Sequence, residues 1–333
     1  MKLTKLGKSV LFLSALFLAI WMIHPVVWTP EANAAQEQVR LKMGGSTTGT
    51  LIYMQSAVLV DVWKRNIPDL DITLMATAGS AANQVPIDRG ELDIASSSIA
   101  ADWWAMNGVH FIKTKLSNFC SFLPANLGFH HAFTYADSSI KNWRELDGKR
   151  VHLGARASAT SVSNEEMINA LNVKPKYVFS SPAEAGDMVK DRRVDALVYG
   201  VGAPYSMFID IAKAIPIKFI PMEPEEQERI GKAFPYVFPT VIPSKTYSFQ
   251  SEDWPTVVTY VNFIVRPGLS EELVYKLTKV SWEHWNEVGQ AVPAAKSVSP
   301  KDMVRMVAPI HPGAVKYYKE IGINIPDRLI WKK

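Results

Sequence analysis

The feature that most constrains the fold of this chain is a strand–turn–helix pattern that occurs twice. In residues 39–43 of the first copy, apolar and basic residues alternate, which predicts a half-buried strand. A glycine- and hydroxyl-rich turn follows at 44–50, and apolar residues then recur at helical spacing. Two more strands are predicted at 70–74 and 92–98, with a short helix at 81–88 between them. This β-α-β-α-β order predicts a parallel sheet.

The second copy lies in the middle of the chain. Strands are predicted at 149–154, 176–181 and 194–200, and helices at 162–171 and 183–190 connect them. The strands of both copies end in small or hydroxyl residues. Because ligands of open α/β sheets bind outside the carboxyl ends of the strands, each copy predicts one ligand-facing edge. We therefore predict an α/β fold with two lobes, each built on a mainly parallel sheet.

The stretches between the copies suggest where the chain passes from one lobe to the other. Residues 103–122 are aromatic and without regular pattern, and a strand is predicted around residues 131–135. Residues 234–247 carry several prolines among β-type residues. Such a proline density excludes a helix and predicts an edge strand or an extended crossover. We expect one discontinuous lobe of residues 35–124 and 243–333, a second lobe of residues 125–242, and a hinge with two crossings.

The N-terminal 34 residues have the pattern of a signal peptide. Three lysines precede an apolar run, and Ala32-Asn33-Ala34 provides a small-x-small cleavage site. We expect export across the inner membrane to the periplasm; retention as an anchor is the alternative. Without residues 1–34 the formal net charge falls from +4 to +2, a balance that predicts neither nucleic acid nor a membrane surface as partner. The single cysteine, Cys120, excludes an intramolecular disulfide.

The turns at the strand ends predict a site for a small anionic ligand. Backbone N–H groups and hydroxyls at a helix N-terminus are suited to a carboxylate. The candidates from the two copies are Gly45, Ser46, Thr47, Thr48, Tyr53, Gly79, Ser80, Ser97, Arg156, Ser158, Thr160, Ser161, Tyr199 and Gly200.

Each candidate also has a purely structural interpretation. The hydroxyl turns can be ordinary N-caps, and Tyr53 and Tyr199 can be core residues. Arg156 is singled out because its planar guanidinium matches a carboxylate at two points, although a solvent-facing arginine at a loop tip is the alternative.

The usual signatures of catalysis are missing from the sequence. We find no nucleophile elbow, phosphate-binding loop, dinucleotide fingerprint, zinc-protease motif or Cys-x-x-Cys. The pair His130-His131 and the group Glu283, His284 and Glu287 each lack a further metal ligand in the sequence. We therefore predict a binding protein that is not an enzyme and that has no cofactor and no metal site.

Seven segments in this order resemble TAXI-type solute receptors, the extracytoplasmic binding subunits of TRAP transporters. They are GGSTTGT (44–50), ATAGSAANQ (76–84), GELDIA (90–95), ELDGKRVHLG (145–154), VDALVYGVGAP (194–204), FPYVFPTVIPSKTY (234–247) and HPGAVKYYKEIG (311–322).

The resemblance implies a type II periplasmic-binding-protein fold whose lobes close on a solute. It implies a glutamate-like amino acid, a 2-oxoacid or a dicarboxylate as solute, and delivery by a monomer to small and large multi-span TRAP membrane subunits. The family turn Gly-Ala-Pro-Gly-Ser-Gly-Thr is altered here, because Arg156 replaces the proline and Ala157 and Ala159 replace glycines. A ligand-sensing module that docks on a membrane signalling protein is the alternative function.

Overall fold

The computed structural model describes residues 38–110, 112–156 and 158–332. The predicted signal peptide therefore lies outside the described residues. No helix in the described ranges has both the length and the apolar character needed to cross a membrane.

The strands form a single hydrogen-bonded sheet with the order β2-β1-β3-β10-β4-β7-β5-β6, in which β8 pairs with β4 and β9 pairs with β10. Their bounds are β1 (Val39–Gly44), β2 (Leu70–Met75), β3 (Ile94–Ser98), β4 (Cys120–Tyr135), β5 (Arg150–His152), β6 (Lys176–Val178), β7 (Ala196–Val201), β8 (Ile217–Phe219), β9 (Phe238–Ile242) and β10 (Trp254–Val265).

Both predicted β-α-β-α-β units are confirmed. Strand β1 pairs in parallel with β2 and β3, and β5 pairs in parallel with β6 and β7. The predicted α/β class is therefore correct. The prolines of the stretch at 234–247 also behave as expected. Among the described strands β9 pairs with β10 alone, so it is an edge strand.

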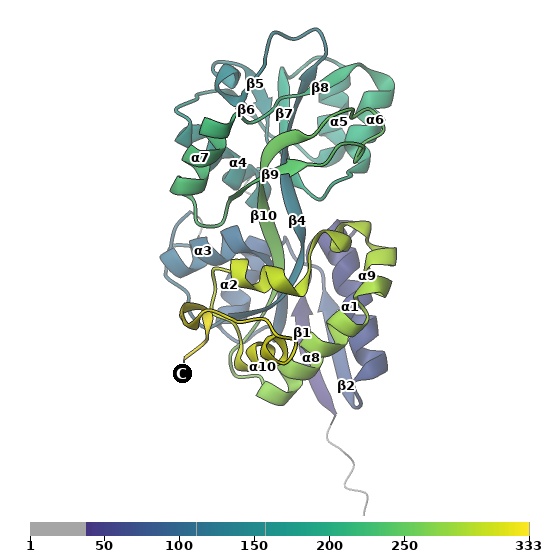
Figure 1. Ribbon diagram of the computed structural model, residues 1–333, viewed down its shortest axis with the longest axis vertical. Coiled ribbons are helices and arrows are strands. Elements are labelled where there is room, and N and C mark those ends of the chain that lie inside the picture. The colour runs from purple at the N-terminus through teal and green to yellow at the C-terminus, as the bar shows by residue number, and fades with distance from the viewer. Residues whose placement is uncertain (1–37, 111, 157, 333) are drawn as a thin grey trace, which may run out of the picture. The chain divides into compact units, whose positions relative to one another are not determined.

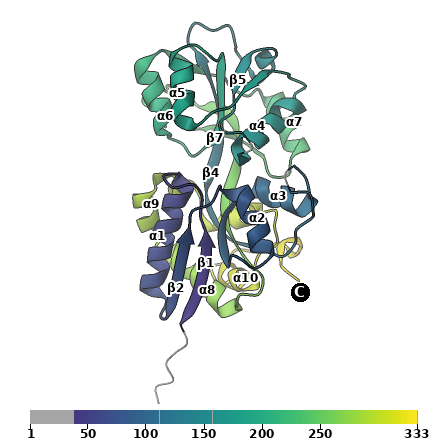
Figure 2. The same ribbon diagram turned by 180° about the vertical axis from the view of Figure 1, so that it is seen from behind.

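The helices divide between two groups of strands. Helices α1–α3 and α8–α10 lie beside β1–β3, and α4–α7 lie beside β5–β7 (Figures 1 and 2); we call these groups the first half and the second half. Their bounds are α1 (Leu51–Asn66), α2 (Ser80–Asp88), α3 (Ile99–Asn107), α4 (Ala159–Ala170), α5 (Pro182–Lys190), α6 (Ser206–Ala214), α7 (Pro224–Ala233), α8 (Glu271–Glu283), α9 (Trp285–Ala291) and α10 (Pro312–Glu320).

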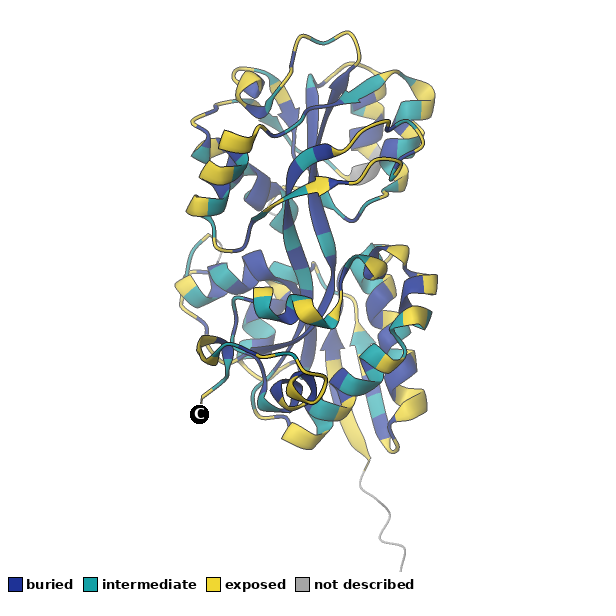
Figure 3. Cartoon of the chain, viewed as in Figure 1, coloured by how far each residue is buried: buried dark blue, intermediate teal, exposed yellow. Residues whose placement is uncertain are grey.

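The two halves share a ribbon of two long antiparallel strands, β4 and β10. Both strands are buried or nearly so along their whole length (Figure 3). This burial on both faces removes the polar–apolar alternation that reveals a half-exposed strand, so β10 was not predicted and β4 was predicted only at 131–135. Helix α3 was not predicted either, because it runs from Ile99 to Asn107 and so includes residues 103–107, which we expected to be irregular. Ser98 caps its start, and Gly108 ends it in the left-handed conformation.

The ribbon determines how the parallel strands of the two halves face each other. Strand β3 runs antiparallel to β10, and β7 runs antiparallel to β4. The carboxyl ends of β1–β3 and of β5–β7 therefore point toward each other along the ribbon. Ser98, at the end of β3, pairs with Val261; Val201, at the end of β7, pairs with Phe129, which itself pairs with Val258. The two ends are thus three residues, about 10 Å, apart along β10.

The core of the second half includes residues that we expected in the first lobe. Tyr247 and Trp254 pack with Phe133 and Phe208 in one hydrophobic cluster. We therefore propose that the second crossing between the halves lies within β10, later in the chain than the expected boundary at residue 242.

Candidate functional site

The predicted site residues lie on two edges. The first edge consists of the turns after β1, β2 and β3, and the second edge consists of the turns after β5, β6 and β7. Because the carboxyl ends of these strands point toward each other, the structure brings the two sets of turns to opposing sides of the ribbon's middle.

On the first edge, Gly45 ties three strand ends together. Its carbonyl accepts hydrogen bonds from Thr77 Oγ1 (3.0 Å), Asn83 Nδ2 (2.8 Å) and Ser96 Oγ (2.6 Å). A side chain at this position would bring a Cβ to 3.0 Å from the ring of Tyr53, so only glycine fits without displacement. Tyr53 is half-buried against this glycine. The polar groups of Gly45 are therefore used within the fold.

The hydroxyl turn of the first edge is partly exposed. Ser46 is buried, whereas Thr47 and Thr48 are exposed. The N-cap of α1 is Thr50, whose hydroxyl accepts from Tyr53 N and donates to Thr47 O. The predicted cap is thus present, but it is not one of the three predicted site hydroxyls.

The other predicted residues of the first edge differ in whether their polar groups are bonded within the fold. Gly79 has φ of +107° and precedes Ser80, the first residue of α2. Ser97, in contrast, is fully buried in a polar network around Asp102. Its Oγ donates to Asp102 Oδ1 (2.5 Å) and accepts from Gln84 Nε2 (2.7 Å). The structure therefore places the Ser97 hydroxyl inside the first half.

Asp102 was not predicted. Besides Ser97, its carboxylate accepts from Gln84 Nε2 (2.9 Å) and Asn262 Nδ2 (2.8 Å). Burial raises the pKa of Asp102 to about 6, and the three donors oppose that shift. The partners are far apart in the sequence, so no local pattern could have indicated this network.

On the second edge, three predicted hydroxyls build the N-terminus of α4. Ser158 caps the helix and accepts from Ser161 N (3.2 Å), and Ser161 Oγ donates to Ser158 O (3.0 Å). Thr160 Oγ1 donates to the carbonyl of Gly200 (3.0 Å), which joins the helix to the end of β7. The helix begins three residues before the predicted start, because the cap at Ser158 extends it.

Arg156 is exposed at the start of this turn. Its guanidinium carbon lies 4.1 Å from the ring centroid of Phe179, at the end of β6. The cation is therefore held on an aromatic face, and none of the described residues accepts a hydrogen bond from its N–H groups. Both interpretations of Arg156 place it at the surface, and the aromatic contact gives the exposed side chain a defined position.

Tyr199 belongs to a stack of rings. Its ring is nearly parallel to those of His152 (6.5 Å, 4°) and Tyr205 (6.2 Å, 17°). Gly154 makes room for it, since a Cβ there would stand 3.1 Å from the Tyr199 ring. Burial lowers the pKa of His152 to about 4 and raises the pKa of Tyr199. Tyr199 thus packs at the edge with only 8 % exposure.

Gly200 faces a buried histidine on β4. A Cβ at Gly200 would lie 3.0 Å from His130 Cε1, and His130 Nδ1 contacts Asn164 Oδ1 at 2.6 Å. Its neighbour His131 has Phe129 O and the Tyr247 hydroxyl as partners. The two imidazoles point to different surroundings, and no cluster of three metal-ligating side chains occurs in the described part of the chain.

The two halves also meet at the carboxylate of Glu166 on α4. It accepts from Tyr236 OH (2.5 Å) in the second half and from Trp104 Nε1 (3.2 Å) on α3 in the first half. His110, just after α3, places Nε2 2.7 Å from the other carboxylate oxygen. We call these four residues the Glu166 junction. It joins the halves away from the ribbon, and no sequence motif predicted it.

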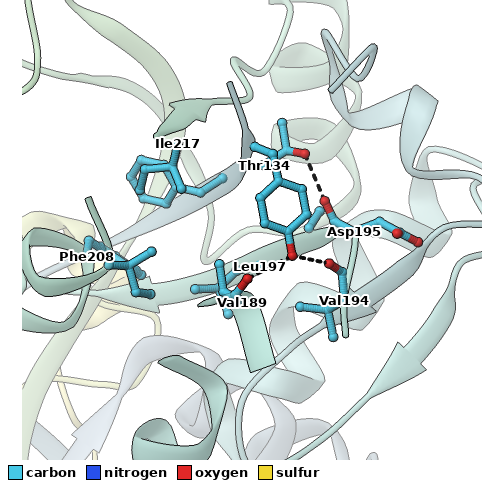
Figure 4. A pocket seen from close by; sticks show the side chains of 11 residues that line it. Thr134, Val189, Val194, Asp195, Leu197, Phe208 and Ile217 are labelled. Atoms are coloured by element: carbon cyan, nitrogen blue, oxygen red, sulfur yellow. Dashed lines mark hydrogen bonds between the residues drawn. The ribbon is translucent and has the colours of Figure 1, made fainter. Parts of the chain in front are cut away.

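A small pocket lies elsewhere, in the core of the second half (Figure 4). Phe208, Leu197 and Ile217 are among its walls, and its polar groups are bonded to each other, as in Thr134 Oγ1 to Asp195 O (2.8 Å). Asp195 precedes β7, so the pocket is at the amino end of that strand. The predicted edge is at the opposite end.

The profile of the NMT1-like family matches residues 43–322. Among solved structures, the chain is similar to a TctC solute binding protein from Polaromonas (12% identity, 77% of this chain and 86% of that one, TM-score 0.49). It is also similar to a probable amino-acid ABC transporter extracellular-binding protein from Bacillus subtilis (12% identity, 78% of this chain and 99% of that one, TM-score 0.48). A third similar structure is that of a putative L-cystine ABC transporter from Listeria monocytogenes (13% identity, 78% of this chain and 96% of that one, TM-score 0.45).

Proposed function

The chain belongs to the NMT1-like family, and from that premise we propose that it is a periplasmic solute-binding protein that captures a small carboxylate and delivers it to a membrane transporter. The observation that carries the proposal is the opposition of the two edges. Their strand ends lie about 10 Å apart along the ribbon, so a small solute can contact both edges at once.

The chemistry of the edges favours an anion. The first turn of α4, capped by Ser158, presents backbone N–H groups at a helix N-terminus, and Arg156 adds a cation on the same turn. Ser46 and Thr48 supply hydroxyls from the first edge. The solute is a glutamate-like amino acid, a 2-oxoacid or a dicarboxylate, and the two edges hold its oxygens between them.

Binding couples to closure of the halves. A solute that contacts both edges only when they are close together shifts the equilibrium toward the closed form. The resemblance to TAXI receptors supports TRAP membrane subunits as the partners and a two-lobed type II periplasmic-binding-protein arrangement. The protein itself then acts as a monomer, without enzyme activity or cofactor.

A thermal-shift screen of the chain from residue 35 tests this function. The panel contains glutamate, 2-oxoglutarate, lactate, pyruvate and succinate, with glutamine and succinamide as partners of lower charge. A ligand that binds only the native state raises the Tm by mass action, so we expect at least one carboxylate to raise it and its less charged partner to do so much less.

A matched pair of variants locates the binding. Ser158→Ala removes the cap of α4 on the second edge, and Ser270→Ala removes the cap of α8, whose hydroxyl accepts from Leu273 N. Each loss costs about 1 kcal/mol of stability. Only Ser158→Ala should weaken the carboxylate affinity. Failure of every carboxylate in the panel to bind, or equal effects of both variants on affinity, would contradict the proposal.

A further inference from the structure

The imidazole of His130 lies directly beside the second edge. Thr160, in the first turn of α4, donates to the carbonyl of Gly200, and Gly200 is the residue against which the His130 ring packs. The absence of a side chain at Gly200 leaves the space that the ring occupies, because a Cβ there would stand 3.0 Å from Cε1 and 3.6 Å from Nε2. The ring is only 1% exposed.

The partners of Asn164 determine which nitrogen of His130 carries the proton. Asn164 Nδ2 donates to the carbonyl of Val198 (3.2 Å), which fixes the orientation of the amide. Asn164 Oδ1 is then the acceptor for His130 Nδ1 at 2.6 Å. In the neutral ring the proton is therefore on Nδ1, and Nε2 presents a lone pair. Burial lowers the pKa of His130 to about 4, so the ring is neutral at neutral pH.

Nε2 has no hydrogen-bond partner among the described residues, although it is buried. The hydroxyl of Ser163, on the adjoining turn of α4, is in the same condition. His131, the next residue on the strand, shows the usual situation, because both of its nitrogens have partners. A buried acceptor without a donor destabilises a fold, and such exceptions call for an explanation.

We propose that His130 Nε2 accepts a hydrogen bond from a hydroxyl or amino group of the bound solute and so determines which carboxylates the protein selects. This inference rests on the proposed function and, among small carboxylates, favours those that carry a hydrogen-bond donor, 2-hydroxy acids included, over 2-oxoacids. Because Thr160 and Gly200 place the ring next to the N-terminus of α4, the donor lies close to the carboxylate, as it does in 2-hydroxy and 2-amino acids. A keto oxygen in that place would set two acceptors against each other.

Calorimetric titration with two matched pairs, glutamate against 2-oxoglutarate and lactate against pyruvate, tests the inference. For the wild-type protein we expect the donor-bearing member of at least one pair to bind about tenfold to a hundredfold more tightly. In His130→Phe, which keeps the ring volume and removes the acceptor, that ratio should fall to about one. His130→Gln, whose amide oxygen is an acceptor, should recover part of it.

His131→Phe is the control, since it removes an equally buried imidazole whose nitrogens both have internal partners; it should lower the Tm and leave the ratio unchanged. Long-range ¹H–¹⁵N NMR adds a direct readout, in which the His130 Nε2 resonance should shift when the donor-bearing solute is added. If carboxylates bind but the ratio is the same in the wild type and in folded His130→Phe, the inference is wrong and the proposed function stands. If no carboxylate binds, the proposed function fails and this inference fails with it.

Discussion

The two edges are built from the same strand–turn–helix pattern, yet they use their polar side chains in opposite ways. On the first edge, the Gly45 carbonyl accepts from three side chains, and Ser97 is consumed by the network around Asp102. On the second edge, Arg156 rests on an aromatic ring and His130 keeps a nitrogen without a partner. The first edge therefore uses most of its buried donors inside the fold, although the amide oxygens of Asn83 and Gln84 have no partner there. The second edge keeps an exposed cation and the His130 acceptor to discriminate between solutes.

The largest expected effect concerns the first edge and its buried carboxylate. Burial raises the pKa of Asp102 to about 6, whereas an aspartate in an unfolded chain titrates at about 3.9. The folded state thus binds this proton more tightly, and the stability that Asp102 contributes is present below about pH 4 and lost as the pH rises to about 6. In Asp102→Asn the unpartnered oxygens of Gln84 and Asn262 can accept from the new amide after rotation.

We therefore expect Asp102→Asn to gain stability over the wild type by up to about 3 kcal/mol between pH 4 and pH 6, as measured by urea unfolding. Asp195→Asn is the control with the opposite sign, because the Arg150 hydrogen bond lowers the pKa of Asp195. The unfolding free energy of Asp195→Asn should be lower than that of the wild type at neutral pH, and this difference should shrink as the pH falls. Parallel pH profiles for the two variants would show that the Asp102 network does not behave as described.

The next effect concerns the contact that joins the halves. Glu166→Gln replaces an acceptor by an NH₂ group that faces Trp104, Tyr236 or His110, so we expect a loss of about 1–2 kcal/mol in stability. Small-angle scattering should show a larger radius of gyration without solute. Glu165→Gln, on the same helix and outside the Glu166 junction, should leave the radius unchanged. Equal radii for both variants would refute a role of the junction in closure.

A smaller effect is expected at the exposed cation of the second edge. Arg156→Ala should weaken the binding of the best carboxylate from the thermal-shift panel about tenfold. The urea midpoint should not change, because the side chain is exposed and rests on the Phe179 ring. Arg156→Lys keeps the charge but loses the planar guanidinium, so its affinity should lie between those of the wild type and Arg156→Ala. Unchanged affinity in calorimetry for Arg156→Ala would remove the residue from the site.

The smallest expected effect concerns Thr50, a hydroxyl of the first edge that serves the fold as a helix cap. Thr50→Ala removes the cap of α1 and should cost about 0.5–1 kcal/mol in unfolding free energy. Because the Thr50 hydroxyl bonds to its own turn, the affinity for the solute should change less than twofold. A larger loss of affinity would mean that the Thr50 hydroxyl itself contacts the solute or positions Ser46 and Thr48, and that it is not only a helix cap.

Prediction from the sequence succeeded where the signal is local. The parallel units could be predicted because alternating residues, glycine turns and helical spacing occur within windows of a few residues. Strand β10 and helix α3 were missed because burial on more than one face erases that periodicity. The candidate residues on the two edges could be located by their position after a strand. Whether a hydroxyl remains available could not be predicted, as Ser97 shows.

The sequence by itself determined that strands end in donor-rich turns and that the chain contains two such sets. Only the tertiary structure decided that the sets oppose each other, through the antiparallel pairing of β4 and β10. It also decided which polar groups remain free. The Ser97 hydroxyl and the Gln84 amide both donate to the Asp102 carboxylate. No described residue donates a hydrogen bond to His130 Nε2. Such partners come from distant segments, so their arrangement exists only in the folded chain.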